Sequence, residues 1–526
     1  MIRRGEARSE EVVAAHLERV RELNPVCNAV VRVREREALA EAREADRAVA
    51  DGREVGPLHG VPCTIKESFE LTGMPQTAGL VSRREVVASR DAITVQRLRD
   101  AGAIPIGVTN VSELLMWMES NNRVYGRCNN PYDPSRIVGG SSGGEGAAVG
   151  AGMAPFGLGA DIGGSIRMPA FFNGVFGHKP SSGLIPNTGQ WPIAENEALT
   201  YLTTGPLARR AEDLWPLVRV LAGPDGECGA CRPVELGDPD GVDVAALRVL
   251  DVPDNGTTPV SGELREAQRR VAGWLRAQGA RVEERRFEWL RRSLHYWAAM
   301  MSAAGGTPFG VLLGGGERKA IAPELARWIV RRSDHTLPAL ALAAIERIPE
   351  ALPDRSRELV GEAHALREEL EDALGERGVM LYPSYSRPAP RHYAPLLRPF
   401  HFVYTAIVNV MGFPSTQVPL GLGRDGVPLG VQVVAAHGND HLTIAVARHL
   451  ERAFGGGGRP LRRRGSLGAA PRTRVPWREL VCELAPARGH RARVRQEAAA
   501  ARRRSRAPEV ARPLPRSPSP THRSTR

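Results

Sequence analysis

Apolar positions in the first hundred residues switch between helical spacing and short continuous runs. A spacing of three to four residues predicts a helix over Ser9–Leu23 and a second, highly charged helix over Glu35–Ala50. The run Val61–Lys66 is short and apolar, which indicates a buried strand. Thr94–Ala101 then predicts a helix that leads into a further strand, IPIGVT.

The same alternation returns in the second half of the chain. Leu247–Val252 predicts a strand and Ser261–Gln278 a helix, and residues 286–375 are mainly helical in pattern. The final part of the pattern predicts three strands and a helix, namely VMLYPS, STQVPLGL, LGVQVVAA and Asp440–Phe454. Strands that alternate with helices are typical of an α/β protein with helices on both sides of a sheet.

We therefore expect one large domain over residues 1–455, followed by a tail over 456–526. Within the domain we distinguish N-terminal helices (1–55), a core that carries the chemistry (56–240) and a helical insert (286–375). The tail is rich in Arg, Pro and Ala and poor in large apolar residues, so we expect it to be disordered.

The formal net charge of +12 suggests an acidic partner, but the basic excess is confined to the C-terminal tail. From Gly455 onward lie 19 of the 71 basic and 4 of the 59 acidic residues, which leaves 52 basic against 55 acidic residues in the body. The body therefore needs no nucleic acid as a partner. The basic tail is either an arm that binds nucleic acid or a membrane surface, or an extension without a selected function. We favour the second interpretation.

The six cysteines are scattered, and only Cys228 and Cys231 form a CxxC pair. One such pair, in a Gly/Pro-rich loop and without nearby histidines, is weak support for zinc, so we favour a plain surface connection and expect no metal. Scattered thiols fit a reducing compartment. The opening MIRRGEARSEE is charged and lacks an apolar core, so no signal peptide is visible and we expect a cytoplasmic protein.

Lysine is rare, since the 71 basic residues include only Lys66, Lys179 and Lys319. Lys66 ends the predicted strand in VPCTIKES. A lysine there either extends to the surface or is partly buried, with a lowered pKa that lets it act as a base. Taken alone, a surface position is the simpler interpretation of Lys66. The scarcity of lysine in the chain strengthens the alternative of a partly buried base.

Two glycine-rich stretches contain serines that could carry chemistry. GGSSGGEG, residues 139–146, is either a flexible linker or a loop in which backbone amides and hydroxyls surround a reacting group, and the apolar run after it favours the loop. DIGGSIR contains Ser165 after two glycines that can point successive amides at one place, as in an oxyanion hole. Asp161 could orient that turn through backbone hydrogen bonds, and Arg167 could support it. Alone, this stretch is also compatible with a plain glycine turn.

The order of a lysine, a Ser-Ser pair in a glycine loop and a Gly-Gly-Ser turn resembles the amidase signature family. The resemblance covers nearly all of residues 1–455, including GHKPSSGLIPNTGQWP, TGPLARRAEDL and GFPSTQVPLGLGRDGVPLGVQVVAA. DIGGSIR, with isoleucine after the aspartate, is most similar to the fatty-acid amide hydrolase branch. The resemblance implies the amidase signature fold, in which a mixed, twisted central sheet is covered by helices on both faces.

The resemblance also implies a catalytic triad of Lys66, Ser141 and Ser165. The family's separation of 24 residues selects Ser141 rather than Ser142, which becomes a supporting residue together with Asp161 and Arg167. In this scheme neutral Lys66 takes a proton from Ser141, Ser141 takes one from Ser165, and Ser165 attacks the amide carbonyl. The oxyanion would be held by backbone amides, those of Ile162, Gly163, Gly164 and Ser165. No cofactor is called for.

By the same resemblance, Leu115, Met116 and Gly140 would contact the substrate, although Leu115 and Met116 are equally compatible with ordinary core positions. The bond between Gly140 and Ser141 would be a cis peptide. The apolar patch Leu337–Ile345 falls where the family's membrane-touching cap lies, but ordinary helix packing is the safer interpretation. The implied partners are a small-molecule amide substrate, a second copy in a homodimer and a weak contact with a membrane surface.

The function implied is hydrolysis of a fatty-acid, aryl or alkyl amide to an acid and ammonia or an amine. A first alternative is the glutaminase component of an aminoacyl-tRNA amidotransferase, which performs the same chemistry within a complex. A second is a catalytically inactive binding protein on the same fold. The intact trio of Lys66, Ser141 and Ser165 argues against the inactive protein.

Overall fold

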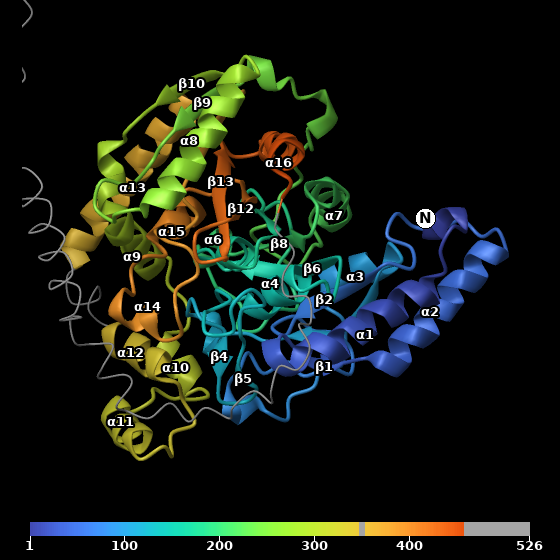
Figure 1. Cartoon of the computed structure of the whole chain (residues 1–526). Coiled ribbons are helices and arrows are strands. Elements are labelled where there is room, and N and C mark those ends of the chain that lie inside the picture. Colours follow the sequence, from blue (N-terminus) through green and yellow to red (C-terminus); the bar gives the residue numbers. More distant parts are fainter. Residues whose placement is uncertain (347–352, 457–526) are drawn as a thin grey trace, which may run out of the picture. The chain divides into compact units, whose positions relative to one another are not determined.

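The computed structural model describes residues 1–346 and 353–456 (Figure 1). The predicted tail lies outside the described residues from position 457 onward. The described residues form a single α/β domain around one large sheet, which confirms the predicted fold class.

The sheet contains eleven strands in the order β1-β3-β2-β6-β8-β7-β12-β13-β11-β9-β10. It is mixed, because β2 pairs in parallel with β3 and β6, whereas β8 pairs antiparallel with β6 and β7. The strands are β1 (Val30–Val33), β2 (Pro62–Lys66), β3 (Ile104–Thr109), β6 (Phe156–Asp161), β7 (Phe176–Lys179), β8 (Thr203–Ala208), β9 (Arg248–Asp251), β10 (Arg281–Glu284), β11 (Gly378–Tyr382), β12 (Ser415–Leu422) and β13 (Pro428–Ala435). A separate hairpin pairs β4 (Asn121–Asn122) with β5 (Gly126–Arg127).

Helices surround this sheet (Figure 1). They are α1 (Ser9–Cys27), α2 (Glu35–Ala50), α3 (Ile93–Asp100), α4 (Gly143–Gly150), α5 (Arg167–Phe172), α6 (Ala198–Tyr201), α7 (Leu214–Leu221), α8 (Gly262–Ala277), α9 (Ser293–Ala303), α10 (Phe309–Leu313), α11 (Ile321–Ile329), α12 (Leu337–Ile345), α13 (Pro353–Leu374), α14 (Ala394–Leu397), α15 (Val403–Val410) and α16 (Asp440–Phe454). The helical pattern predicted for 286–375 corresponds to α9–α13. No helix among the described residues has the length and apolar character needed to cross a membrane.

Strand β7 shows how the two faces of the sheet are covered. Side chains on a strand alternate between faces. A side chain at Gly177 would meet Ala170 of α5, whereas the neighbouring His178 contacts Asp440 of α16 at 3.0 Å. Helices α5 and α16 therefore lie on opposite faces, and β7 is buried between them.

The predicted elements at both ends of the domain agree with the structure within a few residues, and α2 and α16 have the predicted bounds. The apolar run after GGSSGGEG is not a single element. It divides into the short helix α4, which ends at Gly150, and strand β6, which begins at Phe156. Strands β1, β7 and β8 were not anticipated from the sequence.

The apolar patch Leu337–Ile345 forms helix α12, and its buried side packs in an ordinary helix interface. Leu340 is fully buried, and it shares an apolar cluster with Leu80 and with Leu114 from the core. Ile345, at the end of the helix, is 46% exposed. Helix α12 thus packs against the core.

Close contact between β8 and β7 generates a stability prediction for Gly205. A β-carbon built at Gly205 would lie 2.3 Å from the backbone oxygen of His178, a contact that only backbone displacement can relieve. Gly205→Ala should lower the free energy of unfolding by about 1–3 kcal/mol, the usual cost of overpacking a core. Urea unfolding measures this difference.

Gly273 supplies the matched control, because it lies on the exposed side of α8 with open space around it. Gly273→Ala should stabilise the protein by about 0.5–1 kcal/mol through helix propensity. An unfolding midpoint for Gly205→Ala at or above that of the wild type would contradict the close strand contact.

Candidate active site

Two neighbouring parallel strands bring the predicted site residues to one edge of the sheet. β2 ends at Lys66, and β6 ends at Asp161, immediately before the turn that contains Ser165. In parallel α/β sheets the carboxyl ends of the strands form the usual ligand-binding edge. The loop before α4 carries Ser141 and Ser142 to the same place, since the Ser142 amide donates to the Ser165 carbonyl oxygen at 3.2 Å.

Lys66 is 1% exposed, and its amine contacts the serine loop. Its Nζ donates to Ser141 Oγ at 2.9 Å and to the Ala160 carbonyl oxygen at 3.3 Å. Burial lowers the pKa of Lys66 to about 7, although the carboxyl groups of Asp161 and Glu145 offset part of this effect. At neutral pH a large fraction of the amine is therefore uncharged and able to accept a proton.

The glycines of GGSSGGEG are required by close packing. A β-carbon at Gly140 would lie 2.3 Å from the Trp117 carbonyl oxygen, and one at Gly144 would lie 2.3 Å from the Asn110 amide nitrogen. The Gly140–Ser141 peptide bond is cis, as the resemblance implies. Every residue of the stretch is buried, so it is a built loop rather than a linker.

Asp161 organises the turn that contains Ser165. Its carboxylate accepts hydrogen bonds from the Gly164 amide at 2.6 Å and the Ile166 amide at 3.0 Å. It also accepts two from Arg167, through Nε and Nη2, both at 3.1 Å. Burial alone would raise the pKa of Asp161, but the charge and hydrogen bonds of Arg167 outweigh it and hold that pKa well below its usual range.

The predicted set of oxyanion donors needs one correction. The Gly164 amide is already committed to Asp161, so in this conformation it cannot donate to a ligand as well. The amides of Ile162, Gly163 and Ser165 make no hydrogen bond to any other described residue. These three amides are the ones free to meet a developing negative charge.

Ser165 is 7% exposed, and its hydroxyl makes no hydrogen bond within the described part of the chain. Two aromatic rings face the turn that contains Ser165, since a β-carbon built on Gly163 would approach Phe402 and Trp297 at 3.8 Å. These rings pack edge to face, and the Trp297 indole donates to the Ile162 carbonyl oxygen at 3.4 Å. A substrate at the turn would meet an aromatic wall.

Leu115 and Met116 lie half-buried in a loop next to the site. The following residue, Trp117, is the one whose carbonyl oxygen abuts Gly140. Glu113 fixes this loop to the helical insert, because its buried carboxylate accepts from His335 Nδ1 at 2.8 Å and from the Thr336 amide at 2.7 Å. The loop position is compatible with a substrate contact for both residues.

Sequence reasoning missed several polar side chains that hold the site together. Asn409, from α15, donates to the Asp161 carboxylate at 2.9 Å and accepts from Arg167 at 2.5 Å, and Gln432, from β13, accepts from Arg167 at 2.9 Å. Both are buried and lie more than 240 residues from Asp161 along the chain. No local pattern could have connected them to the turn.

Glu145 was also missed, although a single charge among glycines and alanines could have identified it. Its buried carboxyl accepts from Thr64 Oγ1 at 2.5 Å and from Thr109 Oγ1 at 2.7 Å. Burial raises the pKa of Glu145 to about 8, so this carboxyl is largely protonated beside Lys66. Gly157 leaves room for it, because a β-carbon there would overlap the carboxylate oxygen.

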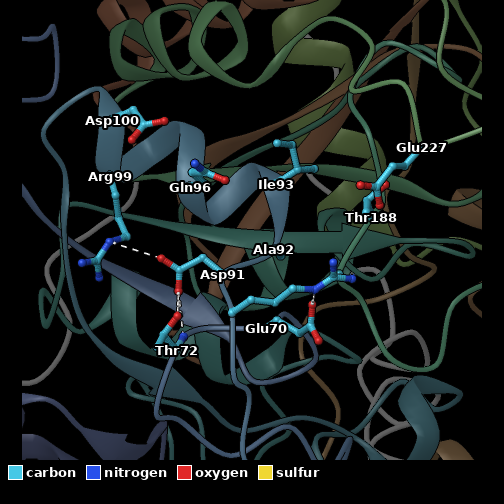
Figure 2. Close-up of a pocket in the computed structure, with 12 residues that line it drawn as sticks. Glu70, Thr72, Asp91, Ala92, Ile93, Gln96, Arg99, Asp100, Thr188 and Glu227 are labelled. Carbon is cyan, nitrogen blue, oxygen red and sulfur yellow. Dashed lines mark hydrogen bonds and ion pairs between the residues drawn. The ribbon is translucent and has the colours of Figure 1, made fainter.

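The polar pocket drawn in Figure 2 lies elsewhere and contains none of the triad residues. Figure 2 shows an ion pair of Arg99 with Asp91 at 3.3 Å, next to the hydrogen bonds of Asp91 with Thr72. Across the described ranges, no group of three or more His, Cys, Asp or Glu side chains is arranged to hold a metal ion.

Comparison with known proteins agrees with this geometry. The amidase family model matches residues 11–444. The chain is 46% identical over 473 residues to a fatty-acid amide hydrolase 2-A of Danio rerio, covering 86% of this chain and 87% of the relative. It is 30% identical to a glutamyl-tRNA(Gln) amidotransferase subunit of Oleidesulfovibrio alaskensis, covering 86% and 95%.

A solved structure of a 6-aminohexanoate cyclic dimer hydrolase has a TM-score of 0.71 and 26% identity, and the match covers 86% of this chain and 95% of the other. Family model, relatives and fold thus agree over the same part of the chain. The chain therefore belongs to the amidase signature family, as the sequence predicted, and is an enzyme that hydrolyses the carbon–nitrogen bond of amides.

Proposed function

We propose that the chain hydrolyses fatty-acid or aryl amides through an acyl-enzyme formed on Ser165. The observation that carries this proposal is the fully buried amine of Lys66, which lies 2.9 Å from Ser141 Oγ. The loop that contains Ser141 is itself bonded to the Ser165 turn, because the Ser142 amide donates to the Ser165 carbonyl oxygen. A buried lysine without a carboxylate in hydrogen-bond contact is poised to be neutral. A neutral amine has a lone pair, so the Ser141 hydroxyl can donate to it.

The relay then runs from Ser165 to Ser141 to Lys66. As Ser165 Oγ attacks the carbonyl carbon, its proton passes to Ser141, and the Ser141 proton passes to Lys66. Amines leave poorly unless they are protonated, so the reverse relay delivers a proton to the leaving nitrogen. The amine departs, and water activated by the same relay hydrolyses the acyl-enzyme.

Backbone amides stabilise the negative oxygen in this scheme. The free amides of Ile162, Gly163 and Ser165 supply donors, while Gly164 acts indirectly by tying the turn to Asp161. Donors that are fixed before the reaction need no reorganisation when charge develops, and each is worth about 3–4 kcal/mol in comparable sites. Asp161 and Arg167 are positioning residues for these donors.

The substrate class rests on two supports. The relative at 46% identity is a fatty-acid amide hydrolase, whereas the amidotransferase relative is 30% identical. The aromatic wall of Trp297 and Phe402 offers apolar contact to an acyl chain or an aryl group next to the turn. In the proposal Leu115 and Met116, from the loop next to Gly140, also contact the substrate.

The proposed setting is a reducing compartment such as the cytoplasm, since the five cysteines among the described residues are free thiols. A homodimer and a weak contact with a membrane surface follow from the family resemblance and belong to the same proposal.

Labelling with a fluorophosphonate probe tests the nucleophile. The wild type should be labelled, and Ser165→Ala should lose all labelling while it unfolds at the wild-type midpoint. Ser68→Ala is the matched control, because Ser68 is buried two residues from Lys66 and its hydroxyl has no hydrogen-bond partner within the described residues. This control should be labelled within about twofold of the wild-type rate. Labelling that survives Ser165→Ala would place the nucleophile elsewhere.

Turnover of different amides distinguishes the proposal from the amidotransferase alternative. The purified chain should hydrolyse oleamide or an aryl anilide by itself and should leave glutamine unchanged, because an apolar wall offers no partner for a polar side chain. Release of ammonia is measured for the unsubstituted amides and release of aniline for the anilide. Activity on glutamine that appears only after addition of partner proteins would overturn the substrate assignment.

A further inference from the structure

A short turn far along the chain from the triad brings two thiols together. Cys228 and Cys231 lie in the sequence ECGACR, and the Cys231 amide donates to the Cys228 carbonyl oxygen at 3.0 Å. A hydrogen-bonded turn of this kind brings its first and last α-carbons within about 7 Å. Disulfides bridge α-carbons about 4.4–6.8 Å apart, so the backbone is already suited to one.

The turn is held at both ends by the core. Arg97 donates to the backbone oxygens of Leu221 and Gly223, at 2.6 and 2.8 Å. On the other side, the Arg232 amide donates to the Gly183 carbonyl oxygen at 3.0 Å. The Arg232 side chain also donates to the Gly229 and Cys231 carbonyl oxygens, both at 2.8 Å. The backbone on both sides of the turn is therefore anchored, which keeps Cys228 and Cys231 close together.

The two thiols are not equivalent. Cys231 is buried, and its sulfur faces the Gly223 carbonyl oxygen at 3.9 Å. Cys228 is half-buried. Hydrogen bonding from Cys231 and from the nearby backbone of Asn187 and Ala230 lowers the pKa of Cys228 against the opposing effect of burial, whereas the pKa of Cys231 is raised.

Cys228 also opens on a groove that small molecules can enter. This groove has a volume of about 330 Å³ and is lined on its apolar side by Trp191, Ile193 and Leu199. It shares Thr188 and Glu227 with the adjoining pocket, where Figure 2 shows these two side chains next to each other. An oxidant can thus reach Cys228 but not Cys231.

We propose that Cys228 and Cys231 form a redox-active dithiol that is converted to a disulfide by hydroperoxides. The Cys228 thiolate attacks a peroxide oxygen, so that an S–O bond forms, the O–O bond breaks and hydroxide leaves. Cys231 gives its proton to the hydroxide, producing water, and its sulfur attacks the Cys228 sulfur. The S–S bond forms as the S–O bond breaks, releasing a second hydroxide that a solvent proton converts to water. The sulfurs are oxidised by two electrons, and one hydrogen peroxide becomes two waters.

The other described cysteines lack these features. Cys27, Cys63 and Cys128 are buried, and burial raises the pKa of each thiol. A thiol that is both protonated and inaccessible reacts slowly with peroxide. They are internal controls within the same chain.

The sequence allows a direct test on the full chain. No lysine or arginine lies between Cys228 and Cys231, so trypsin leaves both on one peptide that contains no other cysteine. After brief treatment with hydrogen peroxide, alkylation under denaturing conditions and mass spectrometry, this peptide should lose both alkylatable thiols and be about 2 Da lighter than its unalkylated dithiol form. Treatment with a dithiol reductant should restore both thiols. The peptides with Cys27, Cys63 and Cys128 should remain fully alkylated.

Two variants assign the roles of the thiols. In Cys231→Ser the reaction should stop at a sulfenic acid on Cys228, which dimedone traps, whereas the wild type should give at least tenfold less dimedone adduct. In Cys228→Ser, Cys231 should remain fully alkylatable. The proposal is overturned if the wild-type peptide keeps both thiols to the same extent as the three buried cysteines. It is equally overturned if dimedone traps Cys228 as readily in the wild type as in Cys231→Ser.

Discussion

The burial of one amine is the constraint on which the rest of the active site depends. Lys66 lies at the end of a central strand with 1% exposure, and it has two oxygen contacts, from Ser141 and Ala160, but no carboxylate in hydrogen-bond contact. An ammonium ion in that place lacks most of its hydration, so the neutral form is favoured. Glu145 does not restore the charge, because it is itself largely protonated between two threonine hydroxyls. In the proposed mechanism, the base is thus produced by folding alone.

The opposite solution operates at the end of the neighbouring strand β6, where a charge is retained at Asp161, the residue after the Ala160 that Lys66 contacts. Asp161 and Arg167 are both fully buried and pair through two hydrogen bonds, and Arg167 also donates to Asn409, Gln432 and the Thr405 carbonyl oxygen. A buried pair is stable only when its hydrogen bonds are satisfied in this way. The pair holds the turn of Ser165, and this rigidity keeps the free backbone amides in one arrangement. In the proposed mechanism the site therefore combines a neutral base, Lys66, with a charged pair, Asp161 and Arg167, that positions the Ser165 turn.

Much of this could be predicted from the sequence, because the signals were local. The lysine at a strand end and the two serine-bearing glycine stretches pointed to residues that the fold brings close together, and the helical periodicity gave the bounds of α2 and α16 correctly. Strands β7 and β8 were missed because both of their faces are buried, so no alternation marks them, and because β7 contains glycine and β8 contains glycine and proline. The role of Asn409 depends on a contact between distant segments, and the commitment of the Gly164 amide to Asp161 depends on the fold of the turn.

The pH dependence of acylation tests the neutral-lysine account most directly. The second-order rate constant for fluorophosphonate labelling of Ser165 should rise about tenfold per pH unit below a midpoint near 7, the pKa of Lys66, and level off above it. The sign follows from the mechanism, since only the deprotonated amine accepts the proton. Lys66→Met should be slower by about 10²–10⁴-fold and lose this midpoint. A wild-type rate that is constant from about pH 5 to pH 9, or a midpoint that persists in Lys66→Met, would contradict the account.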